Sequence, residues 1–448
     1  MKEIFILKDT LQNKITYYHL LTFLIMLPFD RFYTELILIS TVIHTLIHLR
    51  KENFSAIKPQ VLILSSIYLL TIVCTLYTAD KNQAFKDWEK QLAILLFPLI
   101  LSVTTLDIKK YRLQLLKAFA LSCTIICIYL FFDAFKIIRF NKLPISSILS
   151  SEFTNHNFSL PIELHATYFS MYVALSLTVV IYFLIKIPKL IDRFFWSFCC
   201  VILLLSLIQL SSRSILIAVL LLTTFFIPVF LLKREWRTNY IICSTALSAM
   251  AIFSIIRIDS FGKRFVTELK KDLSKPQTNF QTFESRTSRW ECAFELFKQS
   301  PVIGYGTGSE VKLLKEKYYQ KQMYVSYINE FNAHNEYLSF MLKSGILGLF
   351  IYLYVLATGF INAWQKKDFF FFSFLIIISI VSISENILDT NKGIFFFSFF
   401  LSLFASPIGE YKIVNLFTNR YPENKIMSKS AMIMKRNSKS KKIEREIL

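Results

Sequence analysis

The sequence contains little glycine and none of the common metal-binding or nucleotide-binding motifs. Only nine of its 448 residues are glycine, and three of them, Gly304, Gly306 and Gly308, fall within five residues. The patterns HExxH and CxxC and a cluster of carboxylates are absent, so we expect no protein-held metal and no cofactor. GxxxxGK[ST] is also absent, so the glycine run is interpreted as a tight turn with positive φ rather than a phosphate loop.

Charge and cysteine are placed in ways that exclude other classes of protein. The net charge is +20, but Lys and Arg form short clusters between apolar runs and in the C-terminal tail, with no basic aromatic-rich domain, so a nucleic-acid partner is not expected. The seven cysteines lie almost entirely inside apolar runs, which excludes a disulfide framework. No small-residue cleavage site follows the first apolar run, so no cleavable signal peptide is expected.

Apolar sequence dominates what remains. Hydrophobic residues make up 54% of the chain and gather in runs of about 17–25 residues, long enough to cross about 30 Å of hydrocarbon as helices. Backbone polar groups in lipid must be satisfied within the segment, so we predict an all-α integral membrane protein. The predicted spans are 15–30, 33–49, 60–77, 89–105, 113–135, 165–186, 194–211, 213–232, 238–257, 335–363, 368–385 and 391–408.

The positions of the basic clusters predict the topology of these twelve spans. Clusters occupy every second connection and the tail, which by the positive-inside rule places those connections and both termini in the cytoplasm. The chain then divides into nine spans in 1–257, a large outer loop at 258–334, three spans in 335–408 and a basic cytoplasmic tail at 409–448. The long loop is itself basic, but loops beyond about 60 residues cross largely regardless of charge.

Local helices are expected inside the large loop. An apolar pattern with helical spacing begins after a possible Ser285 or Thr287 cap and ends before Pro301. The segment Glu310–Met323 alternates apolar and charged residues and predicts a further helix. The apolar positions of the first helix are Trp290, Ala293, Phe294 and Phe297.

Three arginines are candidates for binding an anionic substrate. Arg286 and Arg289 are three residues apart, so on a helix they share a face that suits a lipid diphosphate or is simply a solvated basic face. Arg213 lies between two apolar runs with no acidic residue near it in sequence. It is either a functional charge at membrane depth or an arginine that snorkels at a helix end.

Two histidines and a glutamate complete the candidate set. His334 is predicted at the first turn of the tenth span, where the helix dipole favours a neutral ring that can accept a proton; an interfacial histidine without chemistry is the alternative. His165 begins the sixth span and faces outward. Glu385, together with Asp389, flanks the last outer turn and pairs either with loop arginines or with Lys392.

These pieces together resemble the O-antigen ligase/polymerase superfamily of bacterial membrane glycosyltransferases. Their order around one large outer loop carries the resemblance, which covers about residues 160–405. The matching segments are Ser212-Arg213, Arg286-x-x-Arg289-Trp290-x-x-Ala293, Pro301-x-x-Gly304-x-Gly306, Ala333-His334-Asn335-x-Tyr337-Leu338, Gly345-x-x-Gly348 and Glu385-Asn386.

The resemblance implies a twelve-helix enzyme of the bacterial inner membrane whose periplasmic loop caps a cavity. Members move a glycan from undecaprenyl diphosphate to an acceptor sugar hydroxyl, such as that of lipid A–core, without a required metal. His334 would be the general base, and Arg213 with Arg286 or Arg289 would hold the diphosphate. Arg289 is preferred of the two because it adjoins Trp290, and His165 and Glu385 are further substrate-binding candidates.

Two other functions remain open at this point. A polymerase of the same superfamily, which extends lipid-linked repeats, shares the same motifs. A transporter or flippase without catalysis would place ionisable residues in the middle of spans, whereas here they cluster at the outer ends. No internal repeat supports an inverted-repeat transporter.

Overall fold

The structure of the protein, a computed structural model, describes residues 2–29, 31–51, 59–273 and 284–405, and every regular element in these ranges is a helix. One helix, or a continuous run of helices, lies on each of the twelve predicted apolar runs. Their bounds are α2 (Leu11–Met26), α3 (Arg31–Ile47), α5 (Pro59–Thr75), α6 (Lys81–Val103), α7 (Ile108–Phe140), α9 (Ala166–Lys186), α10 (Leu190–Leu210), α11 (Arg213–Leu221) continued by η4 (Leu222–Phe226) and α12 (Ile227–Leu231), α13 (Arg234–Ile256), α19 (Glu336–Gln365), α20 (Phe369–Val381) and α21 (Asn391–Ala405).

Six of these helical stretches are long and apolar enough to cross a membrane. They are α7, α9, α10, α11 to α12, α13 and α19, whereas α3, α5, α20 and α21 are apolar but shorter. The 13 residues of α20 extend only about 20 Å as a helix, less than the hydrocarbon thickness. The chain is therefore a multi-pass membrane protein by composition, and the count of twelve spans stays a prediction.

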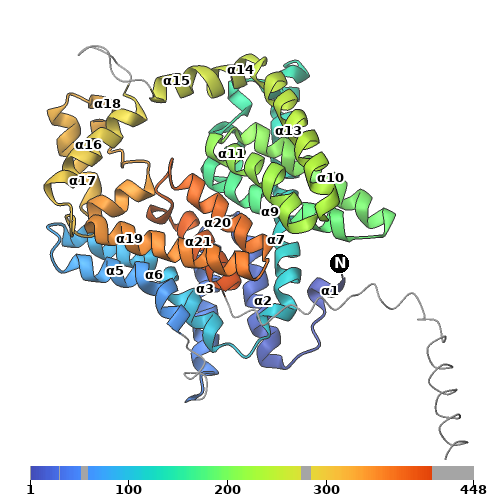
Figure 1. The fold of residues 1–448 in the computed structure, drawn as a ribbon, viewed down its shortest axis with the longest axis horizontal. Coiled ribbons are helices and arrows are strands. Elements are labelled where there is room, and N and C mark those ends of the chain that lie inside the picture. Colours follow the sequence, from blue (N-terminus) through green and yellow to red (C-terminus); the bar gives the residue numbers. More distant parts are fainter. Residues whose placement is uncertain (1, 30, 52–58, 274–283, 406–448) are drawn as a thin grey trace, which may run out of the picture. The chain divides into compact units, whose positions relative to one another are not determined.

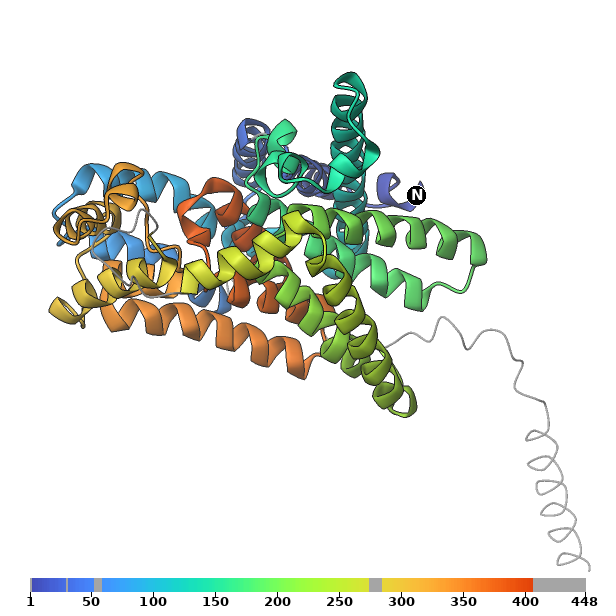
Figure 2. The ribbon, with the colours of Figure 1, turned by 90° about the horizontal axis from the view of Figure 1, so that it is seen from above.

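Burial separates a central helix from a peripheral one (Figures 1 and 2). Of the 18 most apolar consecutive residues of α9, 78% are buried, because α9 packs against α7, α10 and α20. In the equally long apolar stretch of α13, no residue is buried. When the apolar surface of a helix is not covered by other parts of the protein, that surface is available to contact lipid. The α9 helix therefore forms part of the protein interior, and α13 lies at its edge.

A phenylalanine cluster holds α20 against α21. Phe374, Phe396 and Phe400 are fully buried, with ring centroids 4.9 to 6.1 Å apart. Aromatic rings at these separations add to the burial of their area. This packing fixes both ends of the connection between α20 and α21, which carries Glu385.

The two long connections, before α9 and before α19, contain short helices. The bounds in and before the large loop are η1 (Ile145–Leu149), η2 (Ser151–Phe153), α8 (His156–Ser159), η3 (Leu160–Ile162), α14 (Asp259–Gly262), η5 (Lys263–Thr267), α15 (Glu268–Leu273), α16 (Arg286–Gln299), α17 (Glu310–Gln320) and α18 (Tyr324–Ile328). The fifth apolar helix, α7, reaches Phe140 rather than ending near residue 135. The predicted tail at 409–448 lies outside the described residues.

The helix α16 forms where the sequence predicts it, but its buried face matches the predicted stripe only in part. Ser285 caps it by accepting a hydrogen bond from Ser288 N at 3.1 Å. Of the predicted apolar stripe, Ala293 is buried and Phe297 packs partly buried against the same cluster, whereas Phe294 is 44% exposed and was wrongly assigned. Cys292 and Leu296 complete the buried face, together with Arg289. Spacing alone defines a stripe, and packing against α17 and α19 decides which stripe is covered.

Candidate active site

Five charged or titratable side chains from five separate segments form a continuous chain of contacts. Arg213 Nη2 lies 2.5 Å from Asp272 Oδ2, and Arg286 Nε lies 4.0 Å from the same oxygen. Arg286 Nη2 is 3.7 Å from Glu385 Oε1, and His334 Nδ1 is 3.4 Å from Glu385 Oε2. The structure thus brings together four candidates that the sequence separates by up to 172 residues, the interval from position 213 to position 385.

Arg213 reaches this cluster through the tight turn that joins α10 and α11. Ser211 ends α10 with a φ of 50°, and α11 begins two residues later at Arg213 itself. The Arg213 side chain is 17% exposed, and its Nη1 is buried without a hydrogen-bond partner among the described residues. A buried guanidinium nitrogen of this kind remains available to an acceptor oxygen. Arg213 is paired with Asp272 and does not extend freely as a snorkelling side chain would.

Arg286 and Arg289 have different surroundings although both lie near the start of α16. Arg286 donates to Ser384 O at 3.0 Å and contacts Glu385. Arg289 is 8% exposed, with its guanidinium carbon 5.1 Å from the centroid of the Phe331 ring. Burial, with a smaller contribution from the charge of Arg286, lowers the pKa of Arg289. Of the two, Arg286 joins the contact chain.

His334 lies just before α19, outside its first turn. Asn335 is the N-cap, and His334 precedes it with a φ of 47°, so the predicted placement at the first helical turn was wrong. The ring contacts the Glu385 carboxylate, and the His334 backbone N–H donates to Asn332 Oδ1 at 3.0 Å. When Nδ1–H donates to Glu385, Nε2 carries the lone pair that accepts a proton. The sequence-based prediction relied on the helix dipole to favour a neutral ring; in the structure the contact of the ring is with the Glu385 carboxylate, which orients it.

A buried polar network holds the backbone on both sides of His334. Glu310, which is 1% exposed, accepts from Ala333 N at 3.0 Å and from Asn386 Nδ2 at 3.0 Å. Asn386 Oδ1 in turn accepts from Asn335 N at 2.8 Å, and Lys343 Nζ lies 3.2 Å from Glu310 Oε2. Buried charges require such partners to be tolerated. The network therefore restricts the position of the imidazole.

Glu385 is ionised and points to the loop rather than to Lys392. It is 8% exposed; burial opposes ionisation, but the hydrogen bond and charge of His334 and the charge of Arg286 outweigh it, so the pKa of Glu385 lies below its ordinary value. Lys392 instead donates to Leu27 O at 3.0 Å. Of the two partners that the sequence left open for Glu385, the arginine is the one in contact.

His165 caps the start of α9 beside this cluster. Its Nδ1 accepts from Thr167 N at 3.3 Å, and its ring centroid is 4.1 Å from that of His156. Burial lowers the pKa of His165 to about 4 against the opposing influence of Glu385, with smaller lowering effects from His156 and His334. His165 is therefore a neutral polar ring at neutral pH.

The glycine run packs against other backbone. Gly304, Gly306 and Gly308 have φ values of 68°, 92° and 80°. Tyr305 N donates to Leu342 O and Gly306 N to Lys343 O, both at 2.9 Å. A Cβ on Gly304 would lie 2.5 Å from Leu342 O, closer than any real Cβ contact. The run therefore attaches the large loop to α19 at Leu342 and Lys343.

Two participants of this site carried no recognisable signal in the sequence. Asp272 sits in a lysine-rich stretch, Lys270-Lys271-Asp272, which is typical of a solvated surface. Glu310 opens the amphipathic segment of α17 and gives no sign of burial. Within the described residues, no three His, Cys, Asp or Glu side chains lie close enough together to hold a metal ion.

Several helices of this protein are long enough to cross a bilayer. Guanidinium, imidazole and carboxylate groups gather at the ends of these helices. The protein is therefore a multi-pass membrane protein with a polar site at one end of its helices. Residues 198–353 match the family model described as O-antigen ligase. This match confirms the resemblance to the O-antigen ligase superfamily and supports a membrane glycosyltransferase-like enzyme. The matched range includes Arg213, Arg286 and His334 and ends before Glu385.

A second comparison gives a partial relative. A protein of Haemophilus influenzae that bears the name "Uncharacterized protein" is 26% identical over 137 residues, which are 30% of this chain and 34% of that protein. The similarity thus spans about a third of the length of that relative.

Proposed function

We propose that the protein is an O-antigen ligase-like glycosyltransferase that moves a glycan from undecaprenyl diphosphate to a sugar hydroxyl of lipid A–core. The reaction takes place, on this proposal, at the periplasmic face of a bacterial inner membrane, with both termini in the cytoplasm. One observation carries it: an imidazole, two carboxylates and two guanidiniums from separate segments lie in one chain of contacts.

The arginines support binding of the diphosphate. Arg213 and Arg286 both face Asp272 Oδ2, at 2.5 and 4.0 Å, so an anionic oxygen is stabilised between them. A phosphate oxygen is an acceptor of the same kind, and guanidinium binds it bidentately. We therefore assign the diphosphate to Arg213 and Arg286, with Arg289, which is buried against Phe331, in a supporting position behind them.

His334 and Glu385 support activation of the acceptor. The Nε2 of His334 takes the proton of the acceptor hydroxyl, whose oxygen forms the new bond to the anomeric carbon of the glycan. The bond from that carbon to the diphosphate oxygen breaks, and undecaprenyl diphosphate leaves with its charge stabilised by the arginines. Glu385 orients the ring and stabilises the imidazolium that forms, and His165 provides a neutral polar group beside it.

The test uses the purified full-length protein in lipid nanodiscs with an undecaprenyl-diphosphate-linked glycan. Lipid A–core is supplied in one arm and a second lipid-linked glycan in the other, each with EDTA present. We expect glycan on lipid A–core, and we expect His334→Ala to abolish transfer while the histidine control His48→Ala retains it. Extension of the lipid-linked glycan instead would identify a polymerase of the superfamily, and absence of transfer in both arms would overturn the proposal.

A further inference from the structure

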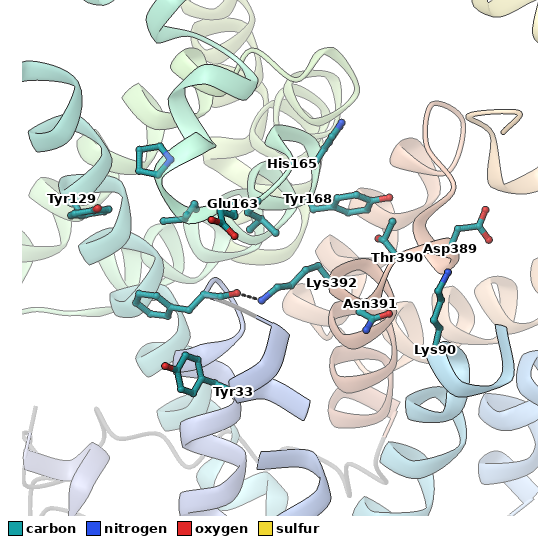
Figure 3. A pocket seen from close by; sticks show the side chains of 14 residues that line it. Tyr33, Lys90, Tyr129, Glu163, His165, Tyr168, Asp389, Thr390, Asn391 and Lys392 are labelled. Carbon is teal, nitrogen blue, oxygen red and sulfur yellow. Dashed lines mark hydrogen bonds between the residues drawn. The ribbon is translucent and has the colours of Figure 1, made fainter. Parts of the chain in front are cut away.

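A cavity of about 840 Å³ is lined by His165 and by Asp389, which lies in the connection that also carries Glu385 (Figure 3). Its walls come from the start of α3, from α6, α7 and α9, and from the connections before α9 and α21. Ligand sites have volumes of about 300–1,000 Å³. The side chains used here are Tyr33, Lys90, Tyr129, Glu163, Asp389 and Lys392.

The charges around this cavity balance. Lys90 and Lys392 face Glu163 and Asp389, two of each sign, whereas the cluster at Arg213 presents guanidiniums to an anion. Lys392 donates to Leu27 O, and Asp389 accepts from Lys343 at 2.7 Å. For Lys90 Nζ and the Glu163 carboxylate, no hydrogen bond or ion pair occurs within the described residues. The cavity therefore offers one donor group and one acceptor group that make no hydrogen bond within the described residues, and it does not favour a polyanion.

Aromatic faces accompany these two groups. Tyr33 and Tyr129 are 53% and 48% exposed, and they line the cavity on the sides of α3 and α7. Their rings are apolar surfaces with a polar tip. A ligand that matches them together with one donor and one acceptor has apolar C–H faces and hydroxyl groups, each of which both donates and accepts. A pyranose ring has this chemistry.

The cavity adjoins the residues of the proposed reaction. Asp389, on its wall, accepts from Asn332 Nδ2 at 3.3 Å, and Asn332 also holds the His334 backbone. His165 lines the same cavity and caps α9 next to the Glu385 cluster. We propose that this cavity is a saccharide subsite that holds a pyranose ring of the glycan next to the bond that is formed. The inference rests on the proposed function for its place in the reaction, but not for saccharide binding itself.

Binding is tested first, without any reaction. Saturation-transfer difference NMR is recorded on the full-length protein in nanodiscs with the methyl glycosides of glucose, galactose and N-acetylglucosamine. We expect transfer to at least one glycoside, reduced about fivefold or more in Tyr129→Ala and Glu163→Gln, a loss of about 1 kcal/mol. The matched controls are Tyr354→Ala, a 47% exposed tyrosine outside the cavity, and Glu152→Gln, on the connection before α9. Signals absent from every glycoside, or equal in variants and controls, would overturn the subsite.

Kinetics then separate the two sources of the sugar and the two proposals. A raised KM for the acceptor in Tyr129→Ala assigns the ring to the acceptor, and a raised KM for the lipid-linked donor assigns it to the donor. Normal transfer with unchanged KM values in both variants would end the subsite and leave the transferase intact. Glycoside binding in this cavity without any transfer activity would confirm the saccharide subsite and contradict the proposed function.

Discussion

Replacing Glu385 by glutamine removes one negative charge from the site and keeps the shape of the side chain. In the protein, Glu385 Oε2 lies 3.4 Å from His334 Nδ1, and its side chain is 11% exposed. Coulomb's law with an effective dielectric constant of about 20 gives about 5 kcal/mol for unit charges at this distance. Because the His334 side chain is 27% exposed and partly hydrated, we take about half, 2–3 kcal/mol.

This loss applies to the transition state, in which His334 has become an imidazolium. We therefore expect Glu385→Gln to lower kcat about 30- to 160-fold. The amide oxygen of the introduced glutamine still accepts from Nδ1–H, so the ring keeps its tautomer and the effect is one of charge. Since the pKa of Glu385 lies below its ordinary value, the carboxylate is ionised at neutral pH, where the two enzymes are compared.

The assay measures initial rates of glycan transfer by both enzymes in nanodiscs, with Glu330→Gln, on the surface of the large loop, as the control. Thermal unfolding in detergent confirms that the variant is folded. A kcat within twofold of the wild type would refute the proposed dyad. A loss confined to the KM of the lipid-linked donor would show that Glu385 acts through Arg286 instead of through His334.

Three further substitutions test other parts of the reasoning. Arg213→Ala should raise the donor KM more than Arg213→Lys, because only lysine keeps a charge; wild-type kinetics in both would leave Arg213 with a structural role alone. Gly304→Ala should lower unfolding stability by about 2 kcal/mol or more, since its φ is 68° and its Cβ would meet backbone; the helical control Gly359→Ala meets only side-chain atoms of Leu375 and Phe371, and equal stability in both would contradict this. His165→Gln should change kcat/KM by the same factor from about pH 5.5 to about 8, because the pKa of His165 is about 4, and a factor that varies with pH in a rate profile would contradict a neutral ring.

The sequence predicted helices well where a local rule applies. The apolar runs and the segment that begins at Glu310 form helices in the structure, and Ser285 caps the start of α16. Composition alone does not fix the number of membrane-crossing helices, because short helices such as α20 have the apolarity of a span without its length. The exposure of Phe294 on α16 has a related cause: this residue satisfies the helical period, but the neighbouring helices cover the side that carries Cys292, Ala293 and Leu296.

By itself, the sequence determined that this chain is helical, apolar and built around one loop rich in arginine and glycine, because backbone hydrogen bonds in lipid must close within each segment. Only the tertiary structure decided which charges meet. Asp272 lies 59 residues from Arg213, and Glu385 lies 51 residues from His334. Helical periodicity and capping act over one turn or two, whereas the pairing of distant side chains depends on how the helices pack. The choice of Arg286 over Arg289 as the residue that contacts Glu385 follows from that packing.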